Sequence, residues 1–120
     1  MEDTTIEQEI QNKGLTAPRV TLSDIEANIA SEHYFTAGQA IGLSPVEGID
    51  YVPPREVHPL DLLTFCVLVL QSGFTVTGES ACASPENFDA ELGRKIARQH
   101  AVSKMWPLMG YALKDRLSAS

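Results

Sequence analysis

The fold is decided by Leu62-Leu-Thr-Phe-Cys-Val-Leu-Val-Leu70, then Gln71-Ser-Gly73, then Phe74-Thr-Val-Thr-Gly-Glu-Ser-Ala-Cys82. A β-branched and aromatic run, a turn that ends in Gly and a second alternating run predict a β-hairpin over about residues 62–82. A hairpin alone is only marginally stable, so another element must cover one of its faces. A helical pattern over about residues 87–118 supplies that element. Residues 61–120 are therefore expected to form a ββα core.

The turn sets which hairpin residues face each other. A two-residue Ser72-Gly73 turn would place Leu63 opposite Cys82 and Cys66 opposite Glu79. Thr77 and Glu79 would then share the face of Cys66, and the two cysteines would point to opposite faces. We therefore expect free thiols rather than a disulfide.

The long C-terminal helix carries two apolar stripes, which is typical of a helix buried on two sides. Ala97 and Ala101 on one stripe would let another helix approach closely, so we expect a homo-oligomer. Pro107 removes one backbone hydrogen bond and predicts a kink or interruption nearby.

The rest of the chain completes one α+β domain over residues 1–120. Residues 1–37 predict N-terminal helices: one near Thr5 that stops at Lys13-Gly14, and one from Thr21 to about Tyr34 or Ala37. Residues 38–60 are rich in Gly and Pro, which predicts a loop.

Charge restricts the function classes. The net charge of −7 argues against DNA or RNA as a partner. Residues 1–61 hold eleven acids and three bases, whereas residues 92–120 hold six bases and one acid. This basic segment fits a small anionic ligand or an acidic partner surface, or it balances the N-terminal acids within the fold. No apolar run is long enough to cross a membrane, and no signal peptide is recognisable, so we expect a soluble, intracellular protein.

The basic helix supplies the first candidate ligand-binding residues. Arg94 and Arg98 lie four residues apart, so both guanidinium groups can converge on one phosphate or carboxylate, with Lys104 nearby. The alternative is solvated surface and ion pairs.

The other candidates are aromatic or polar residues of the types that contact a base or a ring. Each has an alternative role in core packing or in a structural pair. They are His33, Tyr34, Thr77, Glu79, Trp106 and Tyr111. The histidines lack metal-ligand spacing, so we expect no metal and no other cofactor.

Three blocks of the sequence resemble a family of small bacteriophage proteins catalogued by gene number, forty-nine and sixty-six, in two enterobacterial phages. They are Gly73-Phe-Thr-Val-Thr-Gly-Glu-Ser-Ala-Cys82, Asn87-Phe-Asp-Ala-Glu-Leu-Gly-Arg-Lys-Ile-Ala97 and Trp106-Pro-Leu-Met-Gly-Tyr111, with a weaker match at Ile29-Ala-Ser-Glu-His-Tyr-Phe-Thr-Ala37. The family resembles the anti-CBASS sponges, which are compact helical oligomers that bind cyclic di- and trinucleotide immune signals without cleaving them. The resemblance implies expression in the host bacterial cytoplasm and favours Tyr34 as a base-stacking ring.

These observations leave three hypotheses. The first is a non-enzymatic phage protein that sequesters a cyclic nucleotide of host antiviral defence. The second is a protein that binds and inhibits a host enzyme through its acidic N-terminal half. The third is a nucleotide-cleaving enzyme that uses Glu79 or a histidine.

Overall fold

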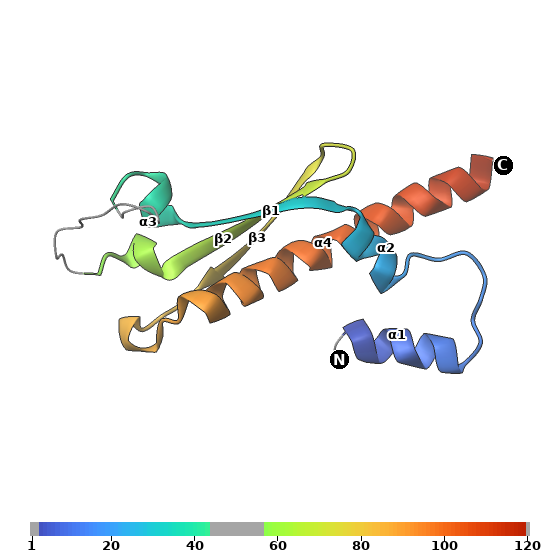
Figure 1. Ribbon diagram of the computed structural model, residues 1–120, viewed down its shortest axis with the longest axis horizontal. Helices are drawn as coiled ribbons and strands as arrows, with labels where there is room; N and C mark the ends of the chain where they lie inside the picture. Colours follow the sequence, from blue (N-terminus) through green and yellow to red (C-terminus); the bar gives the residue numbers. More distant parts are fainter. Residues whose placement is uncertain (1–2, 44–56, 120) are drawn as a thin grey trace.

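The computed structural model describes residues 3–43 and 57–119. It confirms the α+β class, with N-terminal helices, the hairpin and the long C-terminal helix (Figure 1). The strands form one antiparallel sheet in the order β1-β2-β3. In chain order the elements are α1 (Asp3–Asn12), α2 (Leu22–Ala27), β1 (Ile29–Thr36), α3 (Ala37–Ala40), the 3-10 turn η1 (Pro59–Leu62), β2 (Leu63–Leu70), β3 (Thr75–Ala81), the 3-10 turn η2 (Pro85–Asn87) and α4 (Ala90–Ala119). Residues 44–56 of the predicted Gly38–Pro59 loop lie outside the described residues.

The hairpin turn is one residue longer than predicted. The Leu70 N–H donates to the Phe74 carbonyl and the Gly73 N–H to the Leu70 carbonyl, each at 2.9 Å, around a three-residue loop. Gly73 has φ +89°, the left-handed conformation that such a loop requires at its last position. Cys66 therefore faces Gly78 rather than Glu79, and Leu63 faces Ala81 rather than Cys82.

This shift corrects the predicted faces of β3. Because side chains alternate along a strand, a slip of one residue exchanges the two faces. Val76 and Gly78 share the side of Cys66 and are buried, whereas Thr77 and Glu79 point to the other side and are exposed. Cys66 and Cys82 are free thiols, as predicted.

The sequence did not reveal β1. α2 starts where predicted, with the Thr21 side chain as its N-cap, but the helix ends at Ala27 instead of near Tyr34. Ile29–Thr36 then pairs with β2, with Tyr34 opposite Cys66. β2 is buried or half-buried along its whole length. The backbone N–H and C=O groups at both of its edges therefore need hydrogen-bond partners. That tertiary requirement overrides the helical pattern before it.

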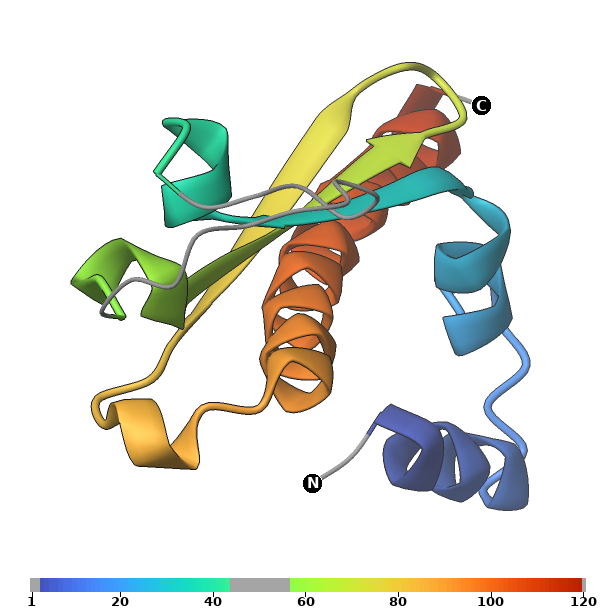
Figure 2. The same ribbon diagram turned by 60° about the vertical axis from the view of Figure 1, so that its left-hand side comes forward.

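α4 covers one face of the sheet, lying across β2 and β3 (Figure 2). Its contact stripe consists of the small buried residues Gly93, Ala97 and Ala101. A Cβ atom at Gly78 would overlap the Ala97 carbonyl oxygen and the Ala101 amide nitrogen, so backbone meets backbone at this point. The alanine stripe that predicted an intersubunit contact is therefore used within the chain. The buried apolar cluster comprises Ile25, Cys66, Leu68, Leu70, Val76, Ala97, Ala101, Val102 and Met105.

α4 runs through Pro107 to Ala119 as one helix, so of the predicted kink or interruption the interruption does not occur. Its last turns extend beyond the sheet (Figure 1). The molecule measures 59 × 29 × 21 Å, and its radius of gyration of 18.2 Å exceeds the about 13–14 Å of a compact domain of this length. The sheet and this elongated shape differ from the compact helical architecture that the resemblance implied.

Replacement of Gly78 by Ala should lower the free energy of unfolding by about 3 kcal/mol, because the new methyl group would push β3 away from the α4 backbone. Urea denaturation measures this loss. The control is Gly110→Ala in α4, where an added Cβ atom would meet no atom within 4 Å. This control should be neutral or gain up to about 1 kcal/mol. Equal stability of Gly78→Ala and the wild type would contradict the close approach.

Candidate functional site

The sheet face opposite α4 carries three of the predicted site residues. We call this surface the open face, because within residues 3–43 and 57–119 no long helix lies across it. The short α3 contacts β1 and β2. Its β2 side chains are half-buried and its β3 side chains are exposed. The open face consists of Ser31, His33 and Phe35 from β1, Leu63, Phe65, Val67 and Val69 from β2, and Thr75, Thr77, Glu79 and Ala81 from β3.

An aromatic pair lies on this face. Phe35 and Phe65 are direct cross-strand partners, and their rings stack with centroids 5.5 Å apart and planes 24° from parallel. Both rings are half-buried, so part of their surface remains accessible to water. A stacked phenyl pair on a sheet surface can receive another flat ring.

Polar groups surround the pair. His33 and Thr77 flank Val67 from the two edge strands, and Glu79 lies across from Phe65. The Ser31 hydroxyl contacts His33 Nε2 at 2.9 Å. An imidazole, a hydroxyl and a carboxylate thus border an apolar centre on the open face.

Tyr34 and Arg98 meet on the α4 side of the sheet, where both contact Glu32. The Tyr34 hydroxyl donates to Glu32 Oε1 at 2.7 Å, and Arg98 Nε donates to the same oxygen at 2.9 Å. Arg98 Nη2 also donates to Glu26 Oε2 at 2.9 Å. Two carboxylates therefore already neutralise this guanidinium, in agreement with the ion-pair alternative.

The same contacts, together with burial, shift the pKa values of the groups on this side of the sheet. The hydrogen bond from Arg98 lowers the pKa of Glu32, and the bonds to Glu32 and Glu26 raise that of Arg98. Burial, with the Glu32 contact, raises the pKa of Tyr34, whose ring packs against the core. Burial also raises the pKa of Cys66. The Tyr34 ring is half-buried and packs against the core, which agrees with its alternative role in core packing.

The remaining predicted residues lie along α4 and do not converge. Arg94 and Lys104 are exposed and make no ion pair in the part of the chain that the structure describes. Trp106 packs against the core and its Nε1–H donates to Asp3 Oδ2 at 3.2 Å, so its alternative as a core anchor holds. Tyr111 is 75% exposed.

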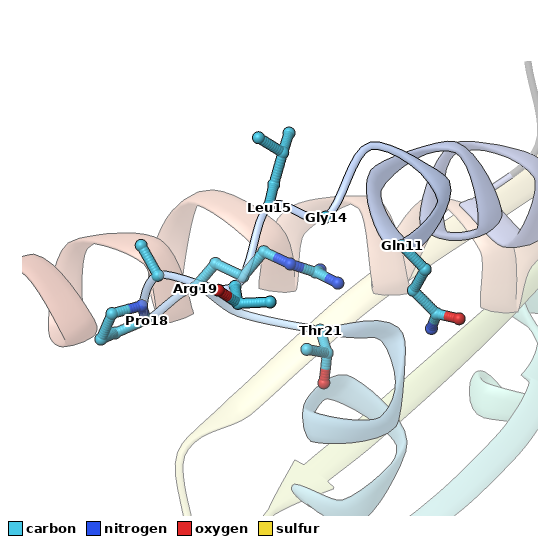
Figure 3. Close-up of a pocket in the computed structure, with 8 residues that line it drawn as sticks. Gln11, Gly14, Leu15, Pro18, Arg19 and Thr21 are labelled. Carbon is cyan, nitrogen blue, oxygen red and sulfur yellow. The ribbon is translucent and has the colours of Figure 1, made fainter.

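A cavity of about 460 Å³ lies beside the segment between α1 and α2 (Figure 3). The side chains of Leu15 and Thr21 point in opposite directions there. Arg19 donates to both carboxylate oxygens of Glu7, at 2.9 and 2.8 Å, and holds the pKa of Glu7 at about 2. The Arg19 charge in the lining is therefore already neutralised by Glu7.

The sequence did not single out Phe35 and Phe65 as candidate site residues. Their signal was the alternation that places His33 and Phe35 on one face of a strand, but it is visible only once β1 is recognised. Within residues 3–43 and 57–119 no three His, Cys, Asp or Glu side chains are grouped to hold a metal ion. Among these residues no helix combines the length and the apolar character required to cross a membrane.

Comparison with protein families identified a match over most of the chain. The model of the family described as "Phage protein (N4 Gp49/phage Sf6 gene 66) family" matches residues 20–117. This range begins just before α2 and ends near the C-terminus of α4. Neither the curated proteins nor the solved structures gave a match.

Replacement of Arg98 by Gln should lower the free energy of unfolding by about 1 kcal/mol near neutral pH, because Glu32 and Glu26 lose their shared cation. Arg98 holds the pKa of Glu32 below its ordinary value of 4.5, so the stabilisation is present above that pH. It disappears as the pH falls through the depressed pKa. Urea denaturation at neutral and acidic pH should show the wild type and variant converging in acid.

The control is Arg94→Gln, one turn earlier on the same helix, which should change stability by less than about 0.5 kcal/mol at either pH. A loss in Arg98→Gln that is equally large in acid would mean that the ion pairs are not its cause.

Proposed function

Because the chain belongs to the phage protein family named for N4 Gp49 and phage Sf6 gene 66, we propose that it acts as a non-enzymatic binding protein in the infected host cytoplasm. Its ligand is a cyclic di- or trinucleotide signal of host antiviral defence, which it sequesters. The binding surface is the open face of the sheet.

The aromatic pair is the observation that carries this proposal. Sheet-borne aromatic rings are a common platform for bases in single-stranded nucleic acids and nucleotides, because every base has a flat face that can stack. Phe35 and Phe65 form one stacked surface on the open face. A base stacked on this pair would replace water on half-buried phenyl rings.

The surrounding polar groups suit a base and its phosphate. Glu79 can accept a hydrogen bond from an exocyclic amine, and the Thr77 hydroxyl can donate or accept. His33 supplies a group that becomes cationic when protonated and can then face a phosphate. A small cyclic ligand needs only this local complementarity, whereas a long nucleic acid would meet the net charge of −7.

The second hypothesis, a decoy surface of N-terminal acids that inhibits a host enzyme, has less support. Glu7 is paired with Arg19 at 2.8 Å and Glu9 with Lys13 at 3.2 Å. Glu26 and Glu32 are paired with Arg98. These four acids are thus held in ion pairs within the chain and are less available to a partner.

Replacement of Phe65 by Leu should raise the dissociation constant for a bound cyclic nucleotide about tenfold or more, because base–aromatic stacking is worth about 1–3 kcal/mol. Leu keeps the site apolar but removes the ring. The measurement is isothermal titration calorimetry, after a thermal-shift screen of cyclic di- and trinucleotides has identified the ligand. Thr77→Ala should weaken binding by a smaller factor.

The matched control is Arg94→Gln, on the helix that covers the opposite face, which should leave the affinity unchanged. A loss of binding in this control alone would move the site to α4. If no nucleotide of the panel shifts the wild type, the proposed ligand class is wrong. Ser31 and His33 lie at the distance of a nucleophile and its base, so cleavage of the ligand must also be tested. A non-enzymatic binding protein should return the nucleotide intact, as measured by chromatography.

A further inference from the structure

The C-terminal part of α4 has a surface that the other residues of 3–43 and 57–119 leave uncovered. From Tyr111 to Ala119 every residue except Leu113 is exposed. Short helical segments are marginally stable in water without a packed face. The exposed apolar side chains in this region include Leu108, at 39%, and Tyr111, at 75%. This part of the helix therefore presents a surface suited to a partner.

The exposed residues form an ordered stripe. Lys104, Leu108, Tyr111 and Asp115 follow one another at intervals of four, three and four residues. This spacing keeps the four side chains on one side of a helix and is the seam spacing of paired helices. We call these four residues the outer stripe. Val102, Trp106, Met109 and Leu113, which are at least half-buried, lie on the other side of the helix.

The charges of the outer stripe identify its occupant. In order, the stripe reads cation, apolar, apolar, anion. An antiparallel copy of the same stripe reads anion, apolar, apolar, cation. Such a copy places Lys104 opposite Asp115 and Leu108 opposite Tyr111, twice over, around a two-fold axis between residues 109 and 110. A parallel copy in register would instead set each charge against its own kind.

We propose that two copies of this chain associate through the outer stripe of α4, as an antiparallel, two-fold symmetric helix pair. Each interface residue then meets its complement, as two-fold symmetry requires. The neighbouring Pro107 and Ala112 are small and exposed, which allows the two helices to approach closely. Neither Lys104 nor Asp115 makes an intrachain ion pair within the described residues, so both charges remain available.

This interface differs from the one expected from the sequence. The sequence predicted a homo-oligomer in which Ala97 and Ala101 form the contact between chains. In the structure these two residues lie against β3 of their own chain. The outer stripe lies further along the helix. The inference depends on α4 alone and does not require the proposed nucleotide ligand.

The test is a charge exchange in the full-length protein, followed by sedimentation equilibrium and native mass spectrometry. The wild type should be a dimer in the micromolar range. Lys104→Glu sets two acids against each other at both ends of the pair, and Asp115→Lys sets two bases. Each single change should raise the dimer dissociation constant about tenfold, because two exposed ion pairs become repulsive.

The double variant Lys104→Glu with Asp115→Lys restores opposite charges only in the antiparallel arrangement, so it should recover the wild-type dissociation constant. Lys95→Glu makes the same charge change at an exposed position outside the stripe and should leave the dimer intact. Circular dichroism verifies that each variant is folded. A wild type that stays monomeric at all concentrations, or a double variant as weak as the single ones, would overturn the proposal.

Discussion

The contact between the backbones of β3 and α4 at Gly78 determines the rest of the structure. A side chain larger than hydrogen there would separate the helix from the sheet, and the small residues Ala97 and Ala101 complete the fit from the helix side. Close packing of this kind fixes the register of β3 as well as the rotation of α4. Once both are fixed, Val76 must face the core and Thr77 and Glu79 must face away from it.

The same constraint determines where the charges of the chain meet. With Ala97 against the sheet, Arg98 lies beside β1 and α2, where Glu32 and Glu26 bind it. The uneven distribution of acids and bases along the sequence is therefore balanced in part within the fold. An anion-binding role for Arg98 would require an anion to displace two carboxylates, which is why the proposed site lies on the opposite face.

The two faces of the sheet have different environments. One face is filled by α4 and supplies the stability of the domain. The other displays Phe35 and Phe65 amid His33, Thr77 and Glu79, with no described long helix over it. Both rings of the aromatic pair are half-buried, so part of each stays accessible to water. Ligand recognition and self-association are proposed for different surfaces, the open face and the outer stripe, so they can be tested separately.

The sequence by itself determined the hairpin, the long C-terminal helix, the capped start of α2 and the phage family, because local periodicity, turn residues and matched blocks are written in consecutive residues. It did not determine β1, since Ile29–Thr36 becomes a strand only when β2 provides an edge to pair with. The register of β3 also depended on a distant contact, that of Gly78 with α4. The sequence nominated His33, Thr77 and Glu79 individually, but their meeting beside Phe35 and Phe65 was decided by tertiary structure alone. Residues from three strands share a face only after strand pairing has set which side chains point the same way.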